Sequence, residues 1–170
     1  MQIRETIAND AEAAPRMILR PLTAGDADEA AELIRTAFGA QSRPTRPPSS
    51  ALRETAQAIA AKIAAGGGFG VFEAGALIAV ALWGIEGDAL HVARVSVAPK
   101  RRGRGIVRSL IAACETEASR RGVGRMTLKT RLELPENERL FERFGFARLK
   151  VEAHPGFEAP TTALMEKVLG

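Results

Sequence analysis

The stretch V-A-P-K-R-R-G-R-G-I-V-R-S-L at residues 97–110 constrains the fold more than any other part of this chain. It leaves one apolar run, passes through five positive charges and two glycines, and enters a second apolar run. The preceding segment A-L-H-V-A-R-V-S-V has the composition of a strand, and the apolar residues from Ile106 to Ala118 recur with a helical period. The stretch therefore predicts a strand-to-helix turn.

Such a turn can hold an anion. A strand followed by a glycine-containing turn leaves free backbone N–H groups at the positive end of the following helix. Gly103 and Gly105 permit close approach of a ligand, and the arginines beside them add positive charge. A P-loop is excluded because G-x-x-x-x-G-K-[ST] does not occur, and the spacing does not fit G-x-G-x-x-G. The alternative is a turn that is only solvated.

The order of the other elements predicts the fold class. We expect a strand at 17–22 and then a helix that begins at an Asp26 cap, with Glu29 completing a capping box. A loop over 39–50 and a helix over 51–65 follow, and after them three strands at 69–73, 77–86 and 89–97. The last elements are a helix over 105–121, a strand at 126–130, a helix over 136–144, and strands near 146–151 and 162–168. This order is that of an α/β (α+β) fold with a mixed, mostly antiparallel sheet of about seven strands and helices on both faces. The strands 89–97 and 126–130 should be parallel neighbours, because a single helix joins them.

Composition limits the number of domains and the kinds of site that the chain can form. The 170 residues, 46% of them apolar, suit a single domain over 1–170 with a loose leader at 1–16. The single cysteine, Cys114, excludes an intramolecular disulfide and is interpreted as a small buried group, and two distant histidines argue against a zinc site, so no metal is expected. Without a signal peptide or a membrane-length apolar run, we expect a cytoplasmic protein that does not bind membranes.

Two motifs resemble one family. L-H-V-A-R-V-S-V-A-P-K-R-R-G-R-G-I resembles the acyl-CoA loop of the GNAT superfamily of N-acetyltransferases, V-x-P-x-x-R-G-x-G-[IV]. L-P-E-N-E-R-L-F-E-R-F-G-F (134–146) is similar to the family's N-x-x-x-[YF]-x-x-x-G-F helix, and the element order matches over roughly 17–169. The resemblance implies a GNAT-like fold and acetyl-CoA as co-substrate, with backbone groups on the pyrophosphate and the pantetheine arm. The cofactor-binding residues that it implies are Val95, Val97, Arg102, Gly103, Arg104, Gly105, Ile106, Val107, Asn137 and Phe141.

The chain departs from the family pattern at two positions. Val107 stands where the pattern Q/R-x-x-G-x-G/A has a small residue, which predicts weaker cofactor binding or a reshaped loop. Phe141 stands where the family usually has a tyrosine acid, and the chain contains no tyrosine at all. Expelling a thiolate with a pKa near 8.5 at neutral pH costs only about 2 kcal/mol, whereas neutralising an amine with a pKa near 10.4 costs about 4 to 5 kcal/mol. A base is therefore needed more than an acid.

The candidate base is His91, eleven residues before Arg102, where several family members carry Glu or His. A pKa near 6.5 suits that role, although a strand histidine can equally be structural. Glu73 and Glu86 are competing bases, each also readable as a surface carboxylate. Arg94 should pair with a carboxylate, either structurally or as a clamp on the acceptor.

Three further assignments follow. A backbone N–H near Val97 would stabilise the tetrahedral intermediate. Asn137 is either a helix cap or a contact to pantetheine. Cys114 is not expected to form an acyl-enzyme, because it lies inside a helix with no histidine close in sequence.

The sequence thus predicts acetyl transfer from acetyl-CoA to a primary amine of a small molecule or peptide by direct attack. The alternative is a non-catalytic, acyl-CoA-binding sensor or partner module, which the departures at Val107 and Phe141 would suit. A nucleic-acid partner is not expected, because the basic residues lack interleaved aromatics. The sequence is compatible with a homodimer. The basic loop residues Arg43 and Arg46 mildly favour an acceptor that carries a carboxylate or phosphate.

Overall fold

The computed structural model describes residues 16–170, so the leader expected at 1–16 lies outside the described residues except for Arg16. In chain order the elements are β1 (Met17–Pro21), η1 (Ala24–Asp26), α1 (Ala27–Gly39), η2 (Ser50–Arg53), α2 (Ala56–Ala65), β2 (Gly67–Glu73), β3 (Ala76–Glu86), β4 (Ala89–Val97), η3 (Pro99–Arg101), α3 (Ile106–Arg120), β5 (Arg125–Arg131), α4 (Pro135–Glu142), β6 (Ala147–Glu152) and β7 (Thr162–Val168), where η marks a 3-10 helix.

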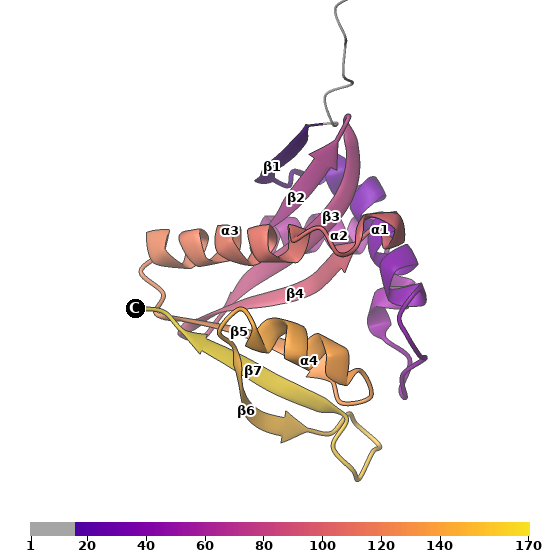
Figure 1. Ribbon diagram of the computed structural model, residues 1–170, viewed down its shortest axis with the longest axis vertical. Coiled ribbons are helices and arrows are strands. Elements are labelled where there is room, and N and C mark those ends of the chain that lie inside the picture. Colours follow the sequence, from indigo (N-terminus) through magenta and orange to yellow (C-terminus); the bar gives the residue numbers. More distant parts are fainter. Residues whose placement is uncertain (1–15) are drawn as a thin grey trace, which may run out of the picture.

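The strands within residues 16–170 form one seven-stranded sheet in the order β1-β2-β3-β4-β5-β7-β6. All neighbours are antiparallel except β4 and β5, which are parallel and joined through α3. Helices α3 and α4 cover one face of this sheet, and α1 and α2 cover the other (Figure 1). The predicted fold class, the β2–β3–β4 meander and the parallel β4–β5 pair are therefore confirmed.

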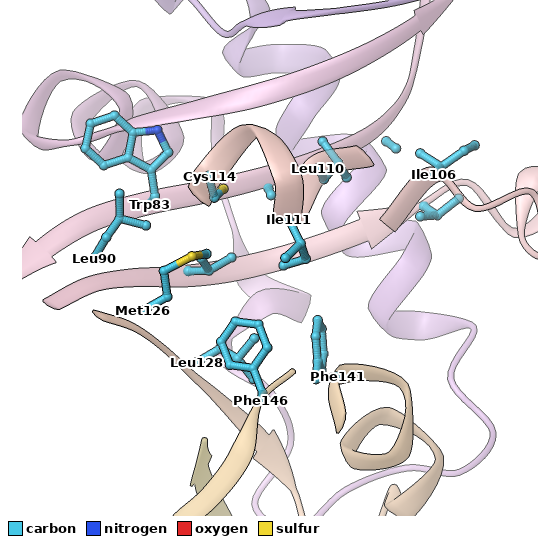
Figure 2. Close-up of a cluster of buried hydrophobic side chains, with 14 of the residues drawn as sticks. Trp83, Leu90, Ile106, Leu110, Ile111, Cys114, Met126, Leu128, Phe141 and Phe146 are labelled. Carbon is cyan, nitrogen blue, oxygen red and sulfur yellow. The ribbon is translucent and has the colours of Figure 1, made fainter. Parts of the chain in front are cut away.

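A separate apolar cluster lies on each face of the sheet. Beneath α3 and α4, side chains such as Leu110, Met126 and Phe146 are almost wholly buried (Figure 2). Beneath α1 and α2 a second cluster contains Ile34 and Ile59, neither of which is exposed to solvent. Burial of one such side chain contributes about 1.5 to 3 kcal/mol. Each helix pair is thus anchored on the sheet independently of the other.

The parallel pairing of β4 with β5 stops early. It joins Leu90 to Met126 and His91 to Thr127, and no later β4 residue pairs with β5 within residues 16–170. Just beyond this point Arg94 has a φ of 56°, in the left-handed region, and the register of β4 against β3 shifts nearby. A bulge of this kind bends a strand. The ends of β4 and β5 therefore separate, and the opening between them contains the site described below.

Two predictions about the helices were wrong. The helix predicted over 51–65 is divided into η2 and α2, because the Thr55 hydroxyl accepts a hydrogen bond from the N–H of Ala58 and starts a new helix there. Leu52, which lies on η2, is consequently 41% exposed. The capping box lies three residues earlier than predicted.

That box is built by Asp26 and Thr23. The Asp26 carboxylate accepts hydrogen bonds from the Thr23 N–H at 2.8 Å and from the Arg20 guanidinium at 2.8 and 3.0 Å. Glu29, expected to close a box on Asp26, instead accepts from the N–H of Leu77 on β3. The pair of Arg20 and Asp26 thus joins β1 to the start of α1.

Asp26→Asn should lower the free energy of unfolding by about 1 to 2 kcal/mol at neutral pH. The hydrogen bonds from Arg20 lower the pKa of Asp26 from 3.8 to about 2, so the stabilisation is present above pH 3.8 and is lost as pH falls toward 2. Urea unfolding at several pH values measures the difference between wild type and variant, which should shrink below pH 3.8. Asp28→Asn, at an exposed position of the same helix, is the control.

Candidate active site

The opening between β4 and β5 contains a cavity of about 1040 Å³. Its walls come from the C-terminal half of β4, the turn before α3, the end of β5, α4, and the segment around η2. The sequence-predicted site residues all line it: His91, Val95, Val97, Arg102, Gly103, Arg104, Gly105, Ile106, Val107, Asn137 and Phe141. The structure thus gathers into one cavity residues that lie up to fifty positions apart.

The turn before α3 presents backbone N–H groups. Gly103 and Gly105 have φ values of 79° and 73°, which only glycine adopts without strain. Gly105 is the N-cap of α3, and within the described chain no side chain caps the helix there. The first intrahelical bond is from the N–H of Ser109 to the carbonyl of Gly105, so the N–H groups of residues 106–108 have no partner in the helix. Free N–H groups at the positive end of a helix are donors of the kind that suit an anion.

Arginine side chains of the turn hold it in place. Arg101 pairs with Glu73 on β2 at 3.0 Å, and the Arg104 guanidinium lies 3.8 Å from the same carboxylate. The guanidinium of Arg102 donates to the carbonyls of Ala37 and Ala40 at the end of α1. The surface position considered for Glu73 is therefore wrong, since it is only 8% exposed. The side chains of Arg101, Arg102 and Arg104 thus contact other parts of the protein, and the groups of the turn best placed to bind a ligand are its backbone N–H groups.

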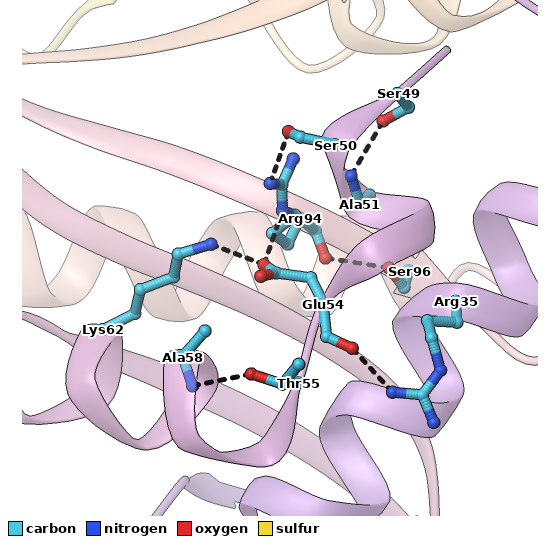
Figure 3. A network of polar contacts seen from close by, with 10 residues as sticks. All are labelled: Arg35, Ser49, Ser50, Ala51, Glu54, Thr55, Ala58, Lys62, Arg94 and Ser96. Carbon is cyan, nitrogen blue, oxygen red and sulfur yellow. Dashed lines mark hydrogen bonds and ion pairs between the residues drawn. The ribbon is translucent and has the colours of Figure 1, made fainter.

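Arg94 stabilises the bulge in β4. Its Nε donates to the Glu54 carboxylate at 2.8 Å, and a terminal nitrogen donates to the Ser50 hydroxyl at 2.9 Å (Figure 3). Lys62 from α2 donates to the same carboxylate. Burial raises the pKa of Glu54, but the bonds from Lys62 and Arg94 outweigh it, so the pKa is below its ordinary value and the group is ionised at neutral pH. The prediction that Arg94 pairs with a carboxylate is confirmed, and the partner fixes η2 and α2 against β4.

His91 lies where β4 and β5 begin to separate. Its Nδ1 and the Thr127 hydroxyl oxygen are 2.8 Å apart, within hydrogen-bonding distance. The tautomer that donates from Nδ1 leaves the Nε2 lone pair free to accept a proton. Burial lowers the pKa of His91 below 6.5, so the imidazole is neutral at pH 7. Glu86, a competing candidate base, lies 3.8 Å from Nδ1 on the exposed side and outside the cavity lining.

Helix α4 forms the wall opposite α3. Leu134 is the N-cap of this helix, so the reading of Asn137 as a cap was wrong, and Asn137 lies inside the first turn facing the cavity. Phe141 is 8% exposed and packs edge-to-face with Phe144 and Phe146. It gives this wall an apolar surface without a hydroxyl. Val107 is half-buried and packs against the same apolar cluster.

The loop between α1 and η2 lines part of the cavity through Gln41, Ser42 and the segment 47–49. The Ser42 hydroxyl donates to Glu136 on α4, and the N–H of Arg46 donates to Glu133 at 3.0 Å. These bonds join the α1 side of the molecule to the α4 side. Arg43 and Arg46, proposed from sequence as contacts for an anionic acceptor, have exposed side chains and are outside the lining. The loop therefore contributes to the wall of the cavity without placing these two charges in it.

Other chemistries find less support. Cys114 is fully buried in α3, and burial raises the pKa of its thiol to about 12, which argues against an acyl-enzyme. Within residues 16–170, no three His, Cys, Asp or Glu side chains gather in a group that could bind a metal ion. Within the same residues, the structure contains no helix of the length and apolarity that a membrane span requires.

Comparison with known proteins shows the family. Residues 29–146 match the model of the acetyltransferase (GNAT) family. This match covers more than half of the chain, so the protein belongs to the GNAT family of acetyltransferases. No curated protein matches the sequence.

Solved structures show the same fold at low identity. The PaiA N-acetyltransferase of Thermoplasma acidophilum, in complex with coenzyme A, is 19% identical with a TM-score of 0.71, covering 90% of this chain and 99% of that one. The ribosomal-protein-S18-alanine N-acetyltransferase of Escherichia coli is 18% identical with a TM-score of 0.72, covering 91% and 94%. YncA of Salmonella typhimurium, with its cofactor acetyl-CoA, is 18% identical with a TM-score of 0.70, covering 91% and 95%.

Gly105→Ala should weaken coenzyme A binding about tenfold or more, because a left-handed alanine costs about 1 to 2 kcal/mol and its relief would move the N–H groups of α3. Gly87→Ala is the matched control, since Gly87 has a φ of 60° in the β3–β4 turn, outside the cavity lining. Urea unfolding should show a similar loss of stability in both variants, whereas calorimetric titration with coenzyme A should show a loss of affinity only in Gly105→Ala. Equal affinities would contradict this role of the turn.

Proposed function

We propose that the protein transfers an acetyl group from acetyl-CoA to a primary amine by direct nucleophilic attack. The observation that carries the proposal is a single large cavity that joins an uncapped helix N-terminus to a neutral histidine through the free edge of β4. An anion site, a strand edge and a base are the three parts that this reaction needs. Membership of an acetyltransferase family supports the same chemistry.

The cavity suits acetyl-CoA. The N–H groups of residues 102–107 would bind the pyrophosphate, with Arg104 and Arg108 adding charge nearby. The edge of β4 at Val95 and Val97 is unpaired on its β5 side within the described residues, so its backbone groups can bind the amides of pantetheine. Asn137 and Phe141 would border the arm from α4. Acetyl-CoA would supply the activated acetyl thioester, and free coenzyme A would be the product that leaves.

The reaction proceeds by addition and elimination. The amine nitrogen attacks the thioester carbon, a C–N bond forms, the C–S bond breaks, and the thiolate leaves. His91 takes the proton that the amine loses, directly or through one bound water. A backbone N–H near Val97 stabilises the oxyanion of the tetrahedral intermediate. The thiolate leaves without a tyrosine acid, at a cost of about 2 kcal/mol at neutral pH.

The non-catalytic alternative differs in one measurable respect. A binding module would bind acetyl-CoA without transferring its acetyl group. The absence of tyrosine and the branched side chain of Val107 are consistent with such a module. Calorimetric titration with acetyl-CoA, coenzyme A and adenosine 3',5'-bisphosphate tests the cofactor site, and thiol release with a broad amine panel tests turnover. Binding with turnover supports the enzyme, binding alone supports the module, and no binding contradicts both.

His91→Gln should lower kcat by about 10² to 10³, because it removes a general base while keeping a polar group beside Thr127. In wild type, kcat/KM should also fall on the acid side with an apparent pKa below 6.5, since burial lowers the pKa of His91 and protonation abolishes the base. That limb should disappear in the variant. Glu86→Gln, at the exposed neighbour, is the control. An unchanged profile in His91→Gln would remove the base role.

A further inference from the structure

The charges around the cavity are strongly unequal. Among residues 16–170, nine Lys or Arg side chains line it but only one carboxylate, Glu136. Several of these cations face the turn before α3, where the phosphates of coenzyme A would neutralise them. The remaining four lie toward the open side between β4 and β5, and they are Arg53, Arg94, Lys129 and Arg131. This side is where an acceptor amine would enter.

Two of those four cations have a carboxylate partner and two have none. Arg94 is paired with Glu54, and Lys129 lies 3.1 Å from Glu152. Within the described chain, no ion pair includes Arg53 or Arg131. The acceptor side of the cavity therefore retains an excess of positive charge, since the carboxylate of Glu133 acts on Arg131 electrostatically without forming an ion pair with it.

Arg131 is the last residue of β5, and its Nη1 is buried without a hydrogen-bond partner in residues 16–170. The hydroxyl of Thr130, which is 5% exposed and also lines the cavity, has no partner there either. The carboxylate of Glu133, close by in sequence, accepts hydrogen bonds from the N–H of Arg46. A buried donor without a partner costs about 1 to 3 kcal/mol. Such donors in the wall of a ligand cavity are expected where the ligand supplies the acceptor.

The strand register places Arg131 near the reaction. His91 pairs with Thr127 in the parallel register, and Arg131 lies four residues beyond Thr127 as Val95 lies four beyond His91. Arg131 therefore lies across the opening from Val95, in the part of β4 that we assign to the pantetheine arm. A group bound by Arg131 would belong to the same small molecule as the attacking amine, a few bonds away from it.

We infer that the acceptor is a small amine carrying a carboxylate or a phosphate, which the guanidinium of Arg131 binds, while Arg53 on η2 adds positive charge. This inference rests on the proposed acetyl transfer. Arginine is suited to the role because its planar fork binds either anion through two hydrogen bonds. Polyamines and other polycationic amines are disfavoured, since residues 16–170 give the cavity one carboxylate against nine cations.

The same charge assists the chemistry. A cationic environment disfavours the protonated form of a bound amine, so it lowers the pKa of that amine and increases its neutral, nucleophilic fraction. The anionic group of the acceptor keeps the molecule bound while its amine loses a proton. Recognition and activation of the acceptor thus depend on the same positive side chains.

The test compares primary amines with similar spacers: propylamine, β-alanine, O-phosphoethanolamine and 1,3-diaminopropane, together with the common amino acids. We expect kcat/KM to be highest for amines with a carboxylate or phosphate. Arg131→Gln should raise the acceptor KM about ten- to a hundredfold, the effect of one charged hydrogen-bond pair, and leave the KM of acetyl-CoA unchanged. Arg131→Lys should recover part of this loss. Arg139→Gln, an exposed arginine of α4 outside the cavity, is the control.

Calorimetric binding of the same amines to the protein loaded with coenzyme A separates this inference from the proposed function. Anionic amines that bind, lose affinity in Arg131→Gln and yet are not acetylated would support the anion site and contradict acetyl transfer. Acetylation that favours propylamine or 1,3-diaminopropane and is unchanged in a folded Arg131→Gln would overturn the anion site and leave acetyl transfer intact. Failure of every anionic amine to bind the loaded protein would also overturn it.

Discussion

The early end of the pairing between β4 and β5 is the constraint on which the site depends. Two residue pairs hold these strands together, and beyond His91 the edge of β4 is released. The left-handed Arg94 bends the strand at that point, and such a conformation costs about 1 to 3 kcal/mol unless its surroundings enforce it. The buried carboxylate of Glu54 supplies that enforcement, because it binds Arg94 and Lys62 together. A polar cluster on one face of the sheet thus maintains the opening in which we propose that the cofactor binds.

The arginines of the turn before α3 have a different role from the one that their charge first suggests. Arg101 and Arg104 face Glu73, and Arg102 caps the end of α1, so these side chains fix the turn against β2 and α1. The backbone of the turn is then preorganised for an anion, while the surrounding charge favours its approach. Among the described residues, the cavity that results has one lining carboxylate, and its positive charge extends through Arg131 to the side on which we propose that the acceptor binds.

Much of the fold could be predicted from the sequence because its signals are local. Strand alternation and the helical period from Ile106 to Ala118 indicated the meander, the turn and the parallel pair, and the two motifs indicated the family. The errors and omissions concern contacts between distant residues. The division of the helix at Glu54 has a local cap in Thr55, but the ion pair that holds Glu54 there comes from Arg94, forty residues away, and the burial of Glu73 depends on Arg101. That Nη1 of Arg131 is buried without a hydrogen-bond partner in residues 16–170 becomes visible only when β5 is placed beside the cavity.

Hydrogen–deuterium exchange with and without coenzyme A tests the central claim most directly, because it reports on backbone N–H groups one segment at a time. If the cofactor occupies the opening between β4 and β5, exchange should slow in peptides that contain residues 95–97 and 102–107. Exchange in β6 should remain unchanged, since none of its residues lines the cavity. Binding of coenzyme A without protection of either segment, or with protection only elsewhere, would contradict the account.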